Sequence, residues 1–314
     1  MKAKVYIDGE AGTTGLEIRA RLEGRRDLEI IELKERRRDV EARREALNEA
    51  DVSILCLPDD AAREAVALIE RPTARVIDAS TAHRTAPGWV YGFPELTAPQ
   101  RETIAEATRV SNPGCYPTGA LGLLRPLVAS GLVPAEWPVT INAVSGYSGG
   151  GKAMIAEFED KASEAYVETP FRTYGLTLEH KHVEEMRVHA GLAHRPLFAP
   201  AVARYRQGML VDVPLQLWAL PGAPTVADLA AVLEAAYEGQ HFVEVVGPEA
   251  CAGIKTLDPE GLNGTNHLRL YVFGNEGQGQ VRLVALLDNL GKGASGQAVQ
   301  CLNIMLGRDE REGI

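Results

Sequence analysis

The sequence predicts an α/β domain with a doubly wound parallel sheet, followed by an α+β domain with several strands and few helices. The chain has 314 residues, which is long enough for two domains. Its first third alternates short apolar runs with helix-forming stretches, the order that builds a parallel sheet. After residue 138 the apolar runs become rich in β-branched residues and lie between turn signals, which is typical of a strand-rich second domain.

Composition and charge narrow the classes of partner. The chain carries 33 Lys and Arg against 43 Asp and Glu, a formal net charge of −10. This balance argues against nucleic acid or an anionic membrane as the main partner, but not against a small anionic substrate. The chain starts with a strand-like segment, and its apolar runs are too short to span a membrane. Because the four cysteines are scattered, we expect a cytoplasmic protein with reduced thiols and no metal site.

A glycine-rich loop follows the first predicted strand, residues 4–7. Its glycines are three residues apart, and a helix follows that we expect to bury Leu16, Ile18 and Leu22 on one side. In a Rossmann-like βαβ unit, bare backbone amides and a helix N-terminus bind a dinucleotide pyrophosphate. A plain strand-turn-helix is the alternative, because glycine spacing alone is a weak signal. The candidate cofactor contacts in this loop are Gly9, Gly12, Thr13, Thr14 and Gly15.

The end of the second predicted strand bears on the choice of dinucleotide. Glu32 lies where an NAD site places an acid for the ribose diol. Lys34 and Arg36 follow at once, and basic side chains there suit an adenosine 2′-phosphate. We therefore favour NADP over NAD, with a solvated basic start to the next helix as the alternative.

Two further strands, residues 51–58 and 74–80, extend the predicted sheet. Cys56 lies among apolar residues of the first of these, so we expect it in the core. Arg84 follows the second one, at the carboxyl end of a parallel strand, where ligands bind in such sheets. Arg84 is therefore a candidate clamp for a substrate anion, and an ordinary surface arginine is the alternative.

Cys115 lies at a forced bend, within SNPGCYPTG (residues 111–119). Pro117 suits the first turn of a helix, so the thiol sits at a helix N-terminus, where the dipole favours thiolate. A reactive cysteine in a chain with a nucleotide loop indicates covalent catalysis combined with hydride transfer. The alternative is an inert cysteine buried under the helix.

Several motifs together resemble the compact subfamily of N-acetyl-gamma-glutamyl-phosphate reductases. In addition to the glycine loop and the cysteine motif VSNPGCYPTG, they are IDASTAHR (77–84), YGFPEL (91–96), LEHKH (178–182) and LDNLGKGASGQAVQ (287–300). The resemblance runs from the first strand to the last helix. It implies a glyceraldehyde-3-phosphate dehydrogenase-like fold and NADP-dependent reduction of an acyl phosphate through a Cys thioester, in arginine biosynthesis.

The resemblance also implies roles for single residues. Cys115 is the nucleophile, His180 the catalytic histidine and Glu185 the acid that accompanies it. A histidine near the sulfur can take its proton and later protonate the developing alkoxide. Without the resemblance, an exposed polar turn is the better interpretation of LEHKH. The implied substrate contact is Asn112, and the implied cofactor contacts are Ser80, Asn289 and Lys292.

A glycine-dense loop, residues 145–152, follows the first strand of the second domain. Its backbone amides, with Ser145, Ser148 and Lys152, could hold the substrate's carboxylate or phosphate. A mobile hairpin tip is the equal alternative.

The resemblance finally implies a domain division and an oligomer. We expect residues 1–116 with 288–314 to form the NADP-binding Rossmann domain, and residues 117–287 to form the catalytic and dimerisation domain, in a homodimer or homotetramer. The expected partner is a small acyl phosphate, with no nucleic acid and no membrane. Two alternatives remain: a reductase of an aspartyl or aminoadipyl phosphate, and a nucleotide-binding regulator without catalysis.

Overall fold

The computed structural model describes residues 2–33 and 39–314, and the chain divides into two compact units. Unit 1 comprises Met1–Pro94, Pro99–Gly114 and Ala294–Ile314, and unit 2 comprises Glu95–Ala98 and Cys115–Gly293. The expected division puts Cys115 and residues 288–293 in the first domain. The structure groups both with unit 2, because helix α5 starts at Cys115 and residues 288–293 continue directly from the last strand of that unit's sheet.

Unit 1 is built on a six-stranded sheet of order β2-β1-β3-β4-β6-β5, in which every pair is parallel. This confirms the predicted doubly wound α/β domain. Its strands are β1 (Ala3–Asp8), β2 (Leu28–Ile31), β3 (Val52–Leu55), β4 (Arg75–Asp78), β5 (Val90–Tyr91) and β6 (Arg109–Ser111). Its helices are α1 (Thr13–Leu22), α2 (Val40–Glu49), α3 (Asp59–Ala67), α4 (Gln100–Glu106) and α10 (Gly296–Met305).

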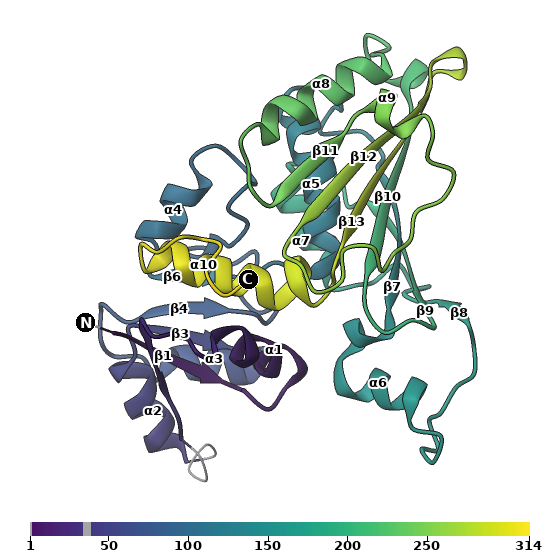
Figure 1. The fold of residues 1–314 in the computed structure, drawn as a ribbon. Helices are drawn as coiled ribbons and strands as arrows, with labels where there is room; N and C mark the ends of the chain where they lie inside the picture. Colours follow the sequence, from purple (N-terminus) through teal and green to yellow (C-terminus); the bar gives the residue numbers. More distant parts are fainter. Residues whose placement is uncertain (1, 34–38) are drawn as a thin grey trace. The chain divides into compact units, whose positions relative to one another are not determined.

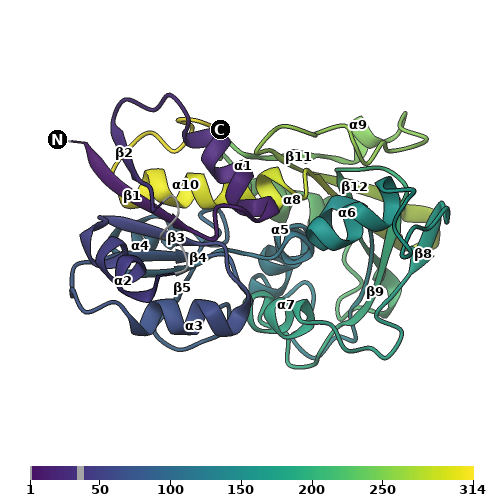
Figure 2. The ribbon, with the colours of Figure 1, turned by 90° about the horizontal axis from the view of Figure 1, so that it is seen from below.

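Apolar cores lie on both faces of this sheet. Figure 2 shows α1 and α10 on one side and α2 and α3 on the other. The prediction that Leu16, Ile18 and Leu22 share one buried helix side is wrong at Leu16, which is 51% exposed while the other two are buried. Residues two apart are about 200° apart around a helix, so Leu16 and Ile18 must face opposite ways.

Unit 2 is built on a seven-stranded sheet of order β11-β12-β13-β10-β7-β9-β8. This sheet is mixed: β11 pairs with β12 and β7 pairs with β9 in parallel, and the other pairs are antiparallel. Its strands are β7 (Thr140–Gly146), β8 (Phe171–Thr173), β9 (Leu197–Ala203), β10 (Met209–Gln216), β11 (Val243–Val246), β12 (Leu268–Asn275) and β13 (Gln280–Leu287). Its helices are α5 (Cys115–Ala129), α6 (Gly151–Glu159), α7 (His182–Ala190), α8 (Val226–Tyr237) and α9 (Pro248–Cys251).

Helices α5 and α8 lie along one face of this second sheet (Figure 1). Gly119 of α5 lies so close to the sheet that a Cβ there would be 2.8 Å from Cγ2 of Val211 on β10. Val211 pairs with Ala285 on β13, which also faces this glycine. Because side chains alternate along a strand, Leu210 and Asp212 face away from α5, toward the opposite side of the sheet.

Candidate active site

The glycine loop of unit 1 has the geometry of a nucleotide cradle. Gly9 has φ +87°, and a Cβ there would lie 2.3 Å from the carbonyl oxygen of Cys56. A Cβ at Gly15 would lie 2.5 Å from the carbonyl oxygen of Gly9, so only glycine fits either position. Gly12 is the N-cap of α1 and can offer no side-chain cap. The first turn, with Thr13 and Thr14, therefore presents N–H groups to an anion, and the loop fits a dinucleotide pyrophosphate.

A cavity of about 340 Å³ opens beside this loop. It is lined by residues of the loop, by Leu33 beyond β2 and by Arg43 of α2. Two nitrogens of the Arg43 guanidinium donate to Oδ2 of Asp8 at 2.8 and 3.1 Å, which fixes a cation at the edge of the cavity. Lys34 and Arg36, the predicted 2′-phosphate ligands, lie outside the described residues. Glu32 is ion-paired with Arg19.

The loop after β4 in unit 1 is tied to buried Asp78. This carboxylate accepts from the backbone N–H of Ser80 at 2.9 Å and from its hydroxyl at 2.7 Å, and Nδ1 of His83 lies 2.7 Å from Oδ2. Arg84 is also buried, and its Nε donates to the carbonyl oxygen of Asn112 at 2.9 Å. Asn112 donates from Nδ2 to the carbonyl of residue 294, while its buried Oδ1 has no partner among the described residues.

In unit 2, Cys115 is the first residue of α5 and is half-buried. The helix continues through Pro117, so the thiol belongs to the first turn, where unpaired N–H groups stabilise negative charge. Gly293 packs directly against it, since a Cβ at that glycine would be 2.8 Å from Cβ of Cys115. The thiol is thus held between a helix start and a side-chain-free backbone.

His180 lies in an aromatic cluster that includes Tyr116, the residue after Cys115. Its ring centroid is 6.1 Å from that of Tyr116 and 5.9 Å from that of Tyr174. Phe198 on β9 closes a third side at 5.2 Å. Burial, with the charge of Lys181 as a smaller effect, lowers the pKa of His180 from 6.5 to about 4. The imidazole is therefore neutral at pH 7.

Two tyrosines next to Cys115 form a hydrogen-bonded pair. The hydroxyl of Tyr174 donates to that of Tyr116 at 2.8 Å, and Tyr116 donates to the carbonyl oxygen of Ala201 at 3.3 Å. Burial raises the pKa of Tyr174 to about 12 and that of Tyr116 still further, and the charge of Cys115 raises both. Both hydroxyls therefore stay protonated at pH 7.

Residues 288–293 form a buried polar loop next to Cys115. The ammonium of Lys292 lies 3.0 and 2.9 Å from the two carboxylate oxygens of Glu95, and both side chains are fully buried. The amide of Asn289 accepts from the N–H of Gly208 at 2.7 Å and donates to Ser148 Oγ at 3.0 Å. These contacts hold both side chains in place, and the cofactor contact that the resemblance implies for Lys292 and Asn289 stays a prediction.

The remaining predicted residues are divided between the buried interior and the surface. Glu185 is buried on α7. Ser145 is buried at the end of β7 and donates to the carbonyl oxygen of residue 146 at 3.0 Å. Lys152 is exposed on α6. The loop at residues 145–152, expected to be either an anion-binding loop or a mobile hairpin tip, contains a 3₁₀ turn, Tyr147–Gly150, that leads into α6.

Sequence reasoning missed the tyrosine pair and Glu95. Tyr116 and Glu95 both lie inside quoted motifs, so the motifs held the signal, but their partners are far away in the chain. Tyr174 is 58 residues from Tyr116, and Lys292 is 197 residues from Glu95.

Within residues 2–33 and 39–314 there is no group of three or more His, Cys, Asp or Glu side chains that could hold a metal ion. No helix in these ranges is long and apolar enough to cross a membrane.

Comparison with known proteins gives consistent matches over the whole chain. Residues 4–107 match the model of the semialdehyde dehydrogenase NAD-binding domain, and residues 115–289 match that of the semialdehyde dehydrogenase dimerisation domain. The chain is 56% identical over 310 residues to N-acetyl-gamma-glutamyl-phosphate reductase 2 of Pseudomonas putida, covering 98% of each chain. It is also 56% identical to the N-acetyl-gamma-glutamyl-phosphate reductase of Brucella ovis, covering 98% of this chain and all of the relative.

Solved structures confirm the predicted fold class. Aspartate semialdehyde dehydrogenase II of Vibrio cholerae superimposes with a TM-score of 0.70 at 14% identity, over 98% of this chain and 99% of that one. The aspartate semialdehyde dehydrogenase of Francisella tularensis gives the same TM-score and identity over 97% of this chain and all of that one. At this identity the likeness concerns the fold alone.

Proposed function

Because the chain belongs to the family of N-acetyl-gamma-glutamyl-phosphate reductases, we propose that its active site reduces this acyl phosphate through Cys115. The enzyme is an acyl-phosphate reductase of arginine biosynthesis that uses a nicotinamide dinucleotide. It releases phosphate and forms N-acetylglutamate 5-semialdehyde. The observation that carries the assignment of Cys115 is its place as first residue of α5, directly before Tyr116, whose ring contacts Tyr174 and His180.

In this mechanism the thiolate of Cys115 attacks the acyl carbon, the bond to phosphate breaks and a thioester forms. Sulfur suits this step because it is nucleophilic at neutral pH, and its acyl adduct remains electrophilic. The start of α5 stabilises the thiolate. Bound nicotinamide dinucleotide supplies the hydride that converts the thioester to the aldehyde. His180, with Glu185 as the acid that accompanies it, handles the proton of this chemistry.

We propose NADP as the cofactor. The basic residues Lys34 and Arg36 follow the second strand in sequence, and Arg43 lies in the cavity beside the glycine loop. Glu32, the residue that would bind a ribose diol, is already paired with Arg19. Arg37, a further basic residue, follows Arg36 directly. Replacing Arg36 and Arg37 by Ser is expected to raise KM for NADPH far more than KM for NADH. If NADH is the better cofactor of the unaltered enzyme, the proposal fails and Glu32 becomes the ribose ligand.

For the substrate, we propose that Arg84, Asn112, Ser145 and Lys152 supply anion-binding and polar groups. The unpartnered Oδ1 of Asn112 and the cation of Arg84 support this for unit 1. The buried Ser145 supports it for unit 2. We further propose a cytoplasmic enzyme, because catalysis needs the Cys115 thiol reduced and all four cysteines are free.

The assignment of the substrate is tested by the reverse reaction. Purified enzyme, NADP and phosphate are mixed with N-acetylglutamate, aspartate or aminoadipate semialdehyde, and reduction of NADP is followed by absorbance. N-acetylglutamate semialdehyde is expected to turn over fastest. Equal or faster turnover of aspartate or aminoadipate semialdehyde would show that the substrate is the corresponding acyl phosphate instead. Binding of NADP without turnover of any of them would support a regulator.

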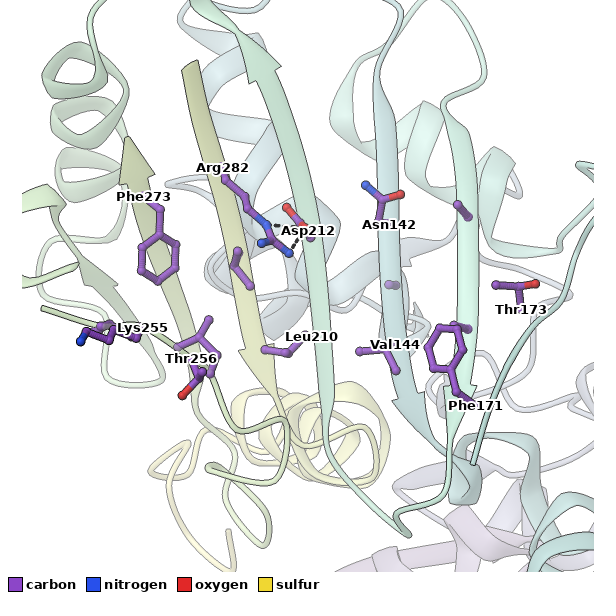
Figure 3. Close-up of a pocket in the computed structure, with 16 residues that line it drawn as sticks. Asn142, Val144, Phe171, Thr173, Leu210, Asp212, Lys255, Thr256, Phe273 and Arg282 are labelled. Atoms are coloured by element: carbon purple, nitrogen blue, oxygen red, sulfur yellow. Dashed lines mark hydrogen bonds and ion pairs between the residues drawn. The ribbon is translucent and has the colours of Figure 1, made fainter. Parts of the chain in front are cut away.

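The second sheet offers a surface for a second copy of the chain. Its face opposite α5 carries a cavity of about 740 Å³, lined by apolar side chains such as Val144, Leu210 and Phe273 (Figure 3). Arg282 crosses this face and donates to Asp212 at 2.7 Å. The match of residues 115–289 to a dimerisation domain supports oligomerisation, and an apolar face of this kind is typical of such interfaces.

We propose that two copies pack through this face, forming at least a homodimer. Leu210→Asp places a charge at its centre and is expected to give monomers in sedimentation velocity. Leu16→Asp, at an exposed leucine of unit 1, is the matched control and is expected to leave the oligomer intact. A Leu210→Asp protein that sediments like the unaltered one would exclude this face.

A further inference from the structure

The cavity beside the glycine loop of unit 1 reaches the end of the second strand. Gly9 and Ala11 of the loop line one part of it, and Ile31 and Leu33, at the carboxyl end of β2, line another. In a dinucleotide-binding fold, the residue at the end of this strand binds the 2′ position of the adenosine ribose. Because both neighbours of Glu32 line the cavity, the part of it beside β2 corresponds to the place of the 2′ substituent.

Arg43 of α2 lines the same cavity and is held by a single carboxylate. Its Nε and Nη2 both donate to Oδ2 of Asp8, at 3.1 and 2.8 Å. Asp8 is the last residue of β1 and is buried, so these bonds fix the direction of the guanidinium. They leave the N–H groups of Nη1 unused by this carboxylate, and a guanidinium held in this way suits a phosphate oxygen.

The other acidic side chains around the cavity are also paired with an arginine. Glu10 accepts from Nη1 of Arg19 at 2.9 Å, and Glu32 is bound by the same guanidinium. These pairs reduce the repulsion that the carboxylates would exert on a bound phosphate. They also engage the side chain that would otherwise accept from the ribose diol.

We propose that Arg43 binds the 2′-phosphate of NADP, and that Asp8 positions its guanidinium for this contact. The inference rests on the proposed function, because it names a residue that gives the enzyme its preference for NADP. The residue that usually binds at the 2′ position directly follows the second strand. Arg43 instead comes from the next helix and is anchored to the first strand. It is a specificity-determining residue in addition to the basic residues that follow β2 in the sequence.

Two fragments of the cofactor test this contact without turnover. 2′,5′-ADP carries the 2′-phosphate and 5′-AMP lacks it, so the ratio of their dissociation constants, measured by isothermal titration calorimetry, isolates the contribution of this group. The unaltered enzyme is expected to bind 2′,5′-ADP more tightly. Arg43→Met should weaken binding of 2′,5′-ADP by about 10–100-fold, the loss of a hydrogen bond between charged groups, and leave binding of 5′-AMP unchanged.

Three further variants separate this role from a defect in folding. Arg44→Met, at the next position of α2, removes an arginine that pairs with Glu70, and it should change neither dissociation constant. Arg43→Met leaves the carboxylate of Asp8 unpaired, whereas the double variant Asp8→Asn/Arg43→Met carries neither charge and should show the same selective loss. Asp8→Asn alone keeps the guanidinium without its anchor, and it should weaken 2′,5′-ADP less than Arg43→Met does.

Two results would overturn the proposal while leaving the NADP site in place. Equal losses for both fragments in Arg43→Met would show that Arg43 contacts the part that they share. Unchanged binding of 2′,5′-ADP in Arg43→Met would show that the basic residues after β2 bind the phosphate alone. If the unaltered enzyme binds the two fragments equally, or binds neither, the proposed preference for NADP itself fails, and this inference fails with it.

Discussion

Replacing Lys292 by Met is expected to destabilise unit 2 strongly and to leave cofactor binding unchanged. The ammonium of Lys292 lies 3.0 and 2.9 Å from the two oxygens of Glu95, and neither side chain has exposed surface. Removing one partner of a buried ion pair costs about 3–5 kcal/mol, because the other charge stays buried without compensation. The matched control is Lys152→Met, at an exposed lysine of the same unit, which should cost less than about 0.5 kcal/mol.

Urea denaturation followed by tryptophan fluorescence measures this loss of stability. Fluorescence titration with NADPH at low temperature measures the dissociation constant of the folded variant. A Lys292→Met enzyme as stable as Lys152→Met, but with weakened NADPH binding, would refute the reasoning and return Lys292 to the cofactor site.

Three further outcomes follow from single positions in the structure. Iodoacetamide should alkylate Cys115 before the other cysteines. Burial raises the pKa of Cys56 to about 12, and Cys251 and Cys301 are buried. Peptide mass mapping that finds another cysteine alkylated first would contradict this. Gly15→Ala should abolish NADPH binding, and Gly12→Ala should weaken it less. The added Cβ would lie 2.5 Å from the carbonyl oxygen of Gly9 in the first variant and 3.4 Å from it in the second. Equal dissociation constants for NADPH in the two variants would argue against the nucleotide cradle. Thr225→Ala breaks the capping box of α8 and should cost about 1 kcal/mol in urea denaturation, and no change would show that the cap is dispensable.

The order of elements and the place of the thiol could be predicted because both depend on local signals. Glycines at positions 9, 12 and 15 mark a loop that tolerates no Cβ at two of its positions. Pro117 marks the start of the helix that begins at Cys115. These signals act over a few residues, so the chain shows them directly.

Features that depend on distant partners could not be predicted. The charge of Lys292 indicates a ligand when it is read alone, and only the fold shows that it is bound by Glu95. The bond from Arg43 to Asp8 depends on how α2 packs beside β1, which residue types do not specify. The roles of Cys115, His180 and Glu185 remain predictions until they are measured.

The most direct test of the central claim is to trap the acyl group on the enzyme. Enzyme without cofactor is mixed with N-acetyl-gamma-glutamyl phosphate, and released phosphate and the masses of tryptic peptides are measured. The account predicts a burst of about one phosphate per subunit and an N-acetylglutamyl thioester on the peptide that contains Cys115, which disappears when NADPH is added. An adduct on another residue, or undiminished turnover by Cys115→Ser, would contradict it.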